Sequence, residues 1–166
     1  ASNNTAVGGD ALTANTTGAN NTAVGAFSGD KNTTGVKNVS VGQGSFTEST
    51  TGDNNTAVGS DSLANNTTAS NNTAVGFNSL NANTTGIDNV AVGSGALDSN
   101  TTANDNIAIG RLALQANTTG ADNVAMGSSA LYNNTTASNN TAIGRSALVA
   151  NTTGADNTAV GANSLK

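Results

Sequence analysis

The side chains that could carry chemistry in this chain are almost all Asn, Thr, Ser and Asp. The 166 residues include no His and no Cys, so the usual ligands of zinc, copper and haem iron are missing. A Ser or Thr nucleophile would have no imidazole beside it to activate it, and no acidic cluster of the carbohydrate-cleaving kind is seen. We therefore expect no enzyme activity, no cofactor and no metal site.

The most regular polar motif is Asn-Thr-Thr, which occurs eight times, and Ser49-Thr50-Thr51 stands at one further equivalent position. Alternation along an extended segment would send the Asn and the second Thr of each motif to the same side. We expect both to point outward. The predicted surface ladder comprises Asn15, Thr17, Asn32, Thr34, Asn66, Thr68, Asn83, Thr85, Asn100, Thr102, Asn117, Thr119, Asn134, Thr136, Asn151 and Thr153.

Such a ladder has three interpretations. A flat Thr-bearing array is what ice-binding solenoids present to ice. Asn-Thr-Thr and Asn3-Asn4-Thr5 are also N-glycosylation sequons, and surface Thr can carry O-linked sugar. In the third interpretation, which we favour, Thr caps a bend and pairs with its neighbour in the next repeat.

A tandem repeat spans residues 1–166 as a single array. A Gly that follows Val, Ile or Met recurs every 17 residues without insertion or deletion, and one unit, counted from Asn4, reads NTAVGGDALTANTTGAN. This Gly column comprises Gly8, Gly25, Gly42, Gly59, Gly76, Gly93, Gly110, Gly127, Gly144 and Gly161. Neither end resembles a polar capping unit, so we expect flanking sequence or end-to-end stacking into an open filament.

The repeat predicts an all-β fold. Thr-Ala-Val is an alternating β-branched stretch that suits a strand, and 17 residues are too few for the repeat of a helical solenoid. No Asn-Gly or Asp-Gly pair signals a tight hairpin. Although Asn, Thr and Gly predominate as in disordered chains, disorder would not preserve the phase of the repeat. We predict a parallel β-solenoid (β-roll) of about ten 17-residue coils, each with two short strands and two bends.

Stacking turns each repeat position into a column of like residues. We expect the Val column (Val7 to Val160, with Ile and Met) and the Leu column (Leu12 to Leu165) to face each other inside. The Ala column (Ala6 to Ala159) should then face outward. The invariant Gly should hold a bend with positive φ. The first-Asn column, which runs from Asn4 to Asn157, should form amide hydrogen bonds along the rod.

Large apolar side chains are few, so burial against other chains would help to stabilise the coils. We expect a homo-oligomer, a trimer, in contact through the Ala face and the β-branched column (Thr5 to Thr158), which includes Val39, Val90, Ile107 and Val124. A formal net charge of −5 argues against nucleic acid as a partner. No stretch approaches the roughly 20 apolar residues of a membrane span.

The phrase Asn-Thr-Ala-Val-Gly-x-x-Ala-Leu, as at Asn4–Leu12, is similar to the head repeats of trimeric autotransporter adhesins. It also looks like repeat tracts of phage tail fibres, and the resemblance covers the whole array. It implies left-handed β-rolls that associate as trimers, lie outside the cell or on a cell or virion surface, and bind host surfaces or glycans. The adhesin unit is shorter, and Asn-Thr-Thr looks like an extension of its second bend.

The remaining candidate residues are acidic, aromatic and basic side chains. Asp88, Asp105, Asp122 and Asp156 recur beside the invariant Asn, where oxygen ligands for calcium are conceivable but a solvated edge is favoured. The variable residues that we expect on the surface as specific contacts are Phe27, Phe46, Phe77, Tyr132, Arg111 and Arg145. The sequence thus predicts a non-enzymatic, extracellular structural or adhesive fibre segment: an adhesin head, tail-fibre shaft or surface filament. The alternative is an ice-binding solenoid that uses the Asn-x-Thr ladder.

Overall fold

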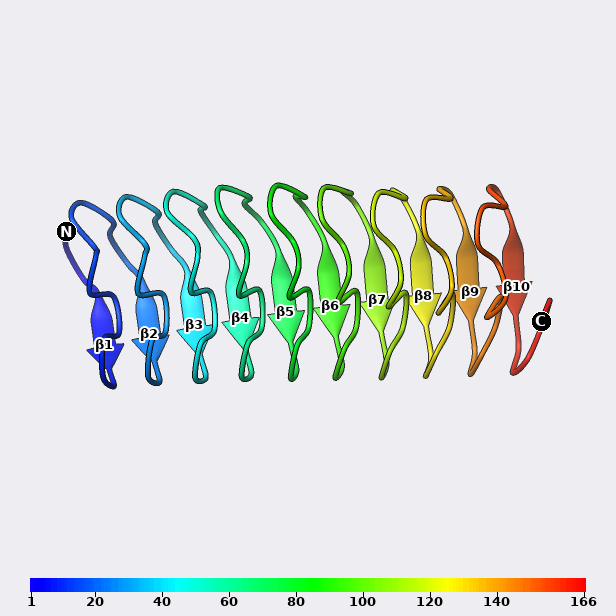
Figure 1. Ribbon diagram of the computed structural model, residues 1–166, viewed down its shortest axis with the longest axis horizontal. Coiled ribbons are helices and arrows are strands. Elements are labelled where there is room, and N and C mark those ends of the chain that lie inside the picture. Colours follow the sequence, from blue (N-terminus) through cyan, green and yellow to red (C-terminus); the bar gives the residue numbers. More distant parts are fainter.

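The computed structural model describes residues 1–166 as one rod of stacked coils (Figure 1). Each coil contributes one three-residue strand, and the strands lie side by side in chain order as a single ten-stranded sheet. The strands are β1 (Thr5–Val7), β2 (Thr22–Val24), β3 (Val39–Val41), β4 (Thr56–Val58), β5 (Thr73–Val75), β6 (Val90–Val92), β7 (Ile107–Ile109), β8 (Val124–Met126), β9 (Thr141–Ile143) and β10 (Thr158–Val160). Neighbouring strands are parallel and in register, so that Ala74 lies opposite Ala91. The predicted parallel β-solenoid is confirmed.

The prediction of two strands per coil is wrong, because only one side of each coil is extended. After the Gly column the chain continues as a run of turns, and the Asn-Thr-Thr segment forms a bend. Within one such coil, Asn78 and Leu80 have φ angles of 52° and 51°. Left-handed residues at alternate positions curl the backbone, and this prevents a second strand.

The apolar half of the interior contains the Ala column, the Leu column and the small residue that precedes each Leu. Ala91, Ala96 and Leu97 are completely buried in one coil. The predicted facing of the strand is therefore wrong: Ala points inward, whereas the Val column points outward. Leu97 reaches across from the opposite side of the coil, so the inner face of the strand has room only for small side chains, which are Ala and, in β3, Ser40.

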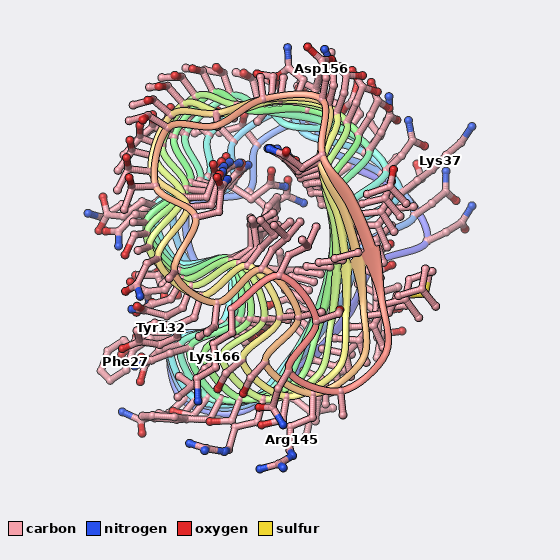
Figure 2. All side chains as sticks on the ribbon, turned by 90° about the vertical axis from the view of Figure 1, so that its right-hand side faces the viewer. Phe27, Lys37, Tyr132, Arg145, Asp156 and Lys166 are labelled. Carbon is pink, nitrogen blue, oxygen red and sulfur yellow. The ribbon has the colours of Figure 1, made fainter.

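The polar half of the interior contains two columns of stacked amides. These are the first-Asn column and a second-Asn column formed by the Asn of each Asn-Thr-Thr (Asn15 to Asn151, with Ser49). A view down the rod shows these amide groups stacked inside one end of the cross-section (Figure 2). Asn72 and Asn83 are both completely buried.

The Gly column has the backbone conformation that the sequence predicts. Gly93 has a φ of 135°, and a Cβ added to it would lie 2.6 Å from the carbonyl carbon of Gly110 in the next coil. Both the conformation and the contact exclude a side chain at this position. The bend at the end of each strand therefore requires Gly.

Candidate interaction surfaces

The rod has no pocket and no group of three or more acidic, His or Cys side chains that could hold a metal ion. It also has no helix with the length and apolar character needed to cross a membrane. The candidate functional features are therefore the columns of side chains on the outside of the coils.

The outer face of the sheet is an uncharged stripe two side chains wide, with one apolar row and one row of Thr, Val and Ile. One row is the Val column, in which Ile109 and Ile143 are 40% and 39% exposed. The other row is the β-branched column, whose side chains lie two residues earlier on each strand. This stripe runs from β1 to β10 and carries no charged residue.

The stripe is most apolar in the strands β6, β7 and β8. There both rows are aliphatic or Met, whereas most other strands carry Thr in the β-branched row. The apolar residues of this central patch are Val90, Val92, Ile107, Ile109, Val124 and Met126. Of the two columns predicted to form a contact surface, the β-branched column faces outward, whereas the Ala column is buried and the Val column takes its place on the outer face.

The Asn half of the predicted surface ladder is wrong. Six of its eight Asn residues are buried: Asn32, Asn66, Asn83, Asn100, Asn117 and Asn134, while Asn15 and Asn151 are half-buried. Asn83 Nδ2 donates to Asn66 Oδ1 at 3.1 Å and to the Gly86 carbonyl at 2.9 Å. The Asn side chain turns inward because the segment bends there, so strand alternation does not apply.

The two Thr residues of each motif have different roles. The first Thr pairs with the next coil, as Thr67 does when its Oγ1 donates to the Thr84 carbonyl at 3.0 Å. The second Thr is exposed in every coil, and no hydrogen bond engages its hydroxyl. This outer Thr column comprises Thr17, Thr34, Thr51, Thr68, Thr85, Thr102, Thr119, Thr136 and Thr153.

The burial of the Asn in most of the Asn-Thr-Thr motifs argues against N-glycosylation of those motifs. Asn83 is completely buried and its amide is hydrogen-bonded, so its sequon is closed to an enzyme while the coil is folded. Exposed sequons exist instead in Asn-Asn-Thr sequences, where the first Asn is exposed at Asn20, Asn54, Asn65, Asn71, Asn133 and Asn139. Asn3-Asn4-Thr5 belongs to this exposed class.

Most of the variable residues singled out from the sequence lie outside. Phe27 and Phe77 are 48% and 56% exposed, and Figure 2 shows Phe27, Tyr132 and Arg145 pointing away from the coil. Arg111 and Arg145 are both exposed. The prediction for Phe46 is wrong, because its side chain is 1% exposed and belongs to the apolar core.

Charged groups are sparse and mostly solvated. Asp88, Asp105 and Asp122 lie exposed in consecutive coils. Lys31 Nζ donates to Glu48 Oε1 at 2.6 Å on the surface, and this hydrogen bond raises the pKa of Lys31. Burial raises the pKa of Asp98, and the amide of Gln115, 3.4 Å from its Oδ2, acts in the opposite direction.

Comparisons of the chain with protein-family models, curated proteins and solved structures find no match. The geometry by itself defines the class: a parallel β-solenoid with one strand per coil, two internal amide columns and an apolar outer sheet face.

Proposed function

We propose that this array is a structural, adhesive fibre segment whose copies associate side by side, as a homotrimer, through the outer face of the sheet. The observation that carries the proposal is the uncharged stripe along the whole rod, with its continuous apolar Val column and its central patch in β6, β7 and β8. Soluble chains rarely leave so continuous an apolar surface uncovered. Its burial is favourable by about 25 cal/mol for each Å² removed from water.

The stripe suits another copy of the same chain. A rotation axis parallel to the rod brings like coils to the same height, so that Ile107 and Ile109 of one copy meet their equivalents in the others. Three such sheet faces, one from each copy, can surround this axis and form a trimer. Asp88 and Asp105 lie on a different column from the stripe, so this arrangement does not force their like charges together.

The remaining surfaces fit a fibre with adhesive contacts. Backbone and amide hydrogen bonds run from coil to coil along the entire rod, which makes it stiff. With the stripe covered, the outer Thr column and the exposed Phe77, Arg111 and Arg145 still face solvent. These groups suit contacts with glycans or another surface, which places the proposed fibre outside the cell or on a cell or virion surface.

Single Cys variants test the association, because the chain has no Cys of its own. Val92→Cys places a thiol on the stripe, and Thr102→Cys places one on the outer Thr column. A short bismaleimide should cross-link copies of Val92→Cys at high dilution and leave Thr102→Cys monomeric on a denaturing gel. Equal cross-linking of both variants, or of neither, contradicts the proposal.

Ice binding is a second candidate, and the outer Thr column is the observation that favours it. Its hydroxyls recur at the coil spacing of about 4.8 Å. The Asn residues expected beside it are buried, so the regular array is one Thr wide. Thermal hysteresis that is lost on replacing Thr68, Thr85 and Thr102 together by Lys would establish this function; no hysteresis in the unaltered chain would exclude it.

A further inference from the structure

The second-Asn column forms an almost continuous chain of amide hydrogen bonds inside the rod. In each regular step, Nδ2 of one Asn donates to Oδ1 of the Asn one coil earlier and to a backbone carbonyl three residues later. Asn100 shows both bonds, at 3.0 Å to Asn83 and at 3.1 Å to Ala103. Each amide therefore uses both N–H groups and is linked to the next amide along the rod.

Ser49 interrupts this chain, because it is the one residue of the column that is not Asn. The Ser side chain ends at the atom where Asn begins its amide group, so it cannot span the distance to its neighbours in the column. The residues on either side are Asn32, one coil earlier, and Asn66, one coil later. All three are buried, with exposures of 1% or less.

Three hydrogen-bonding groups lose their partners at this interruption. Asn32 Oδ1 and Ser49 Oγ are buried atoms without any hydrogen bond. Asn66 Nδ2 donates only to the Ala69 carbonyl, whereas the equivalent atom of Asn83 makes two bonds. A buried polar group without a partner loses its hydration and gains no hydrogen bond in return, so we expect a partner at this place.

We infer that one water molecule binds inside the rod beside Ser49, between Asn32 and Asn66, in place of the missing amide. The water accepts a hydrogen bond from Asn66 Nδ2, donates one to Asn32 Oδ1 and makes a third hydrogen bond with Ser49 Oγ. Three partners are the usual number for a buried water. The surroundings are polar, which favours a water molecule over a dry gap. This site is independent of the association proposed above.

The number of long-lived internal waters, measured by magnetic relaxation dispersion, tests the inference. Ser49→Asn restores the missing amide and should lower the count by one relative to the unaltered chain. Asn117→Ser creates the same interruption at a regular step and should raise the count by one. Thr102→Ser, on the exposed outer Thr column, is the matched control and should leave the count unchanged.

A crystal structure of the unaltered chain should then show the water within hydrogen-bond distance of all three side chains. The inference is overturned if Ser49 Oγ bonds directly to Asn32 Oδ1 with no water between them. It is also overturned if Ser49→Asn folds without losing a water, or if Asn117→Ser folds without gaining one. Because the two variants act in opposite directions, failure of either one to fold leaves the other as the test.

Discussion

Asn106 donates both its backbone N–H and its side-chain amide to Oδ1 of Asn89, at 3.1 Å and 3.3 Å. The same side chain also donates to the carbonyl of Gly120, at 3.0 Å. The first-Asn column thus completes the backbone hydrogen bonding where the chain enters each strand. This requirement explains why the position is Asn in all ten repeats, as the amide-stacking hypothesis expects.

Replacement of Asn106 by Ala should destabilise the rod strongly. The change leaves the buried backbone N–H of Asn123 without a partner, at roughly 1–3 kcal/mol. It also removes one of the two amide donors of the Gly120 carbonyl, which Asn117 Nδ2 still contacts at 2.9 Å. Urea unfolding followed by circular dichroism measures the loss. Thr102→Ala removes an exposed hydroxyl with no hydrogen bond, so its effect should stay within about 0.5 kcal/mol; equal losses in both variants would contradict the role given to Asn106.

Gly93→Ala should also destabilise the rod. The φ of 135° and the close approach of Gly110 leave no place for a Cβ, and strain of this kind costs on the order of 1–3 kcal/mol. Gly9→Ala is the matched control, because a Cβ there meets nothing within 4 Å. Thermal melting of the two variants should separate them clearly, and a Gly93→Ala melt equal to that of Gly9→Ala would show that the bend tolerates a side chain.

Gly29 and Phe46 are the two exceptions in the Leu column, one coil apart and both buried. We expect the large Phe side chain to occupy room that Gly29 leaves. Gly29→Leu alone should then overpack the core, and Phe46→Leu alone should leave a cavity, so each single change should destabilise by about 1–3 kcal/mol. The double variant Gly29→Leu with Phe46→Leu restores the regular column. Unfolding free energies should show a coupling of about 0.5–3 kcal/mol; strictly additive effects would mean that the two sites are independent.

The stability of the rod should depend on pH partly through Asp98. Burial raises its pKa in the folded state above the unfolded value, so the folded state binds the proton more tightly. The contribution of Asp98 therefore becomes less favourable as the pH rises from below the unfolded pKa through the folded pKa. Asp98→Asn should raise the melting temperature at pH 7 and have a smaller effect near pH 3. A gain that is larger at the acidic pH would reverse the expected sign.

The sequence predicts the coil, its period, its parallel pairing and the Gly bend, because each depends on strict repetition. It does not predict which side of the strand faces inward. Alternation separates Ala91 from Val92, but the choice between them depends on Leu97, which enters from the opposite side and leaves space only for Ala. A rule that places the larger apolar residue inside therefore selects the wrong face.

The errors in the surface assignment have local physical causes. Asn66 turns inward because its segment bends, so alternation predicts its direction wrongly. Phe46 differs in type from its neighbours but stands in the Leu column, so its repeat position is the signal that places it in the core. Ser49 is recognisable in the sequence as the one residue of its column that is not Asn. Only the structure, which places that column inside the rod, shows that the exception removes amide hydrogen bonds.

The mass of the array in solution tests the proposed association most directly. Size-exclusion chromatography with light scattering should give one discrete species of three chains, each of 16.0 kDa. Ile109→Lys, which places a charge in the middle of the apolar stripe, should reduce that species to monomers without loss of the β-solenoid circular dichroism signal. A clean 16.0 kDa monomer of the unaltered chain, unchanged by raising the protein concentration, would contradict the account.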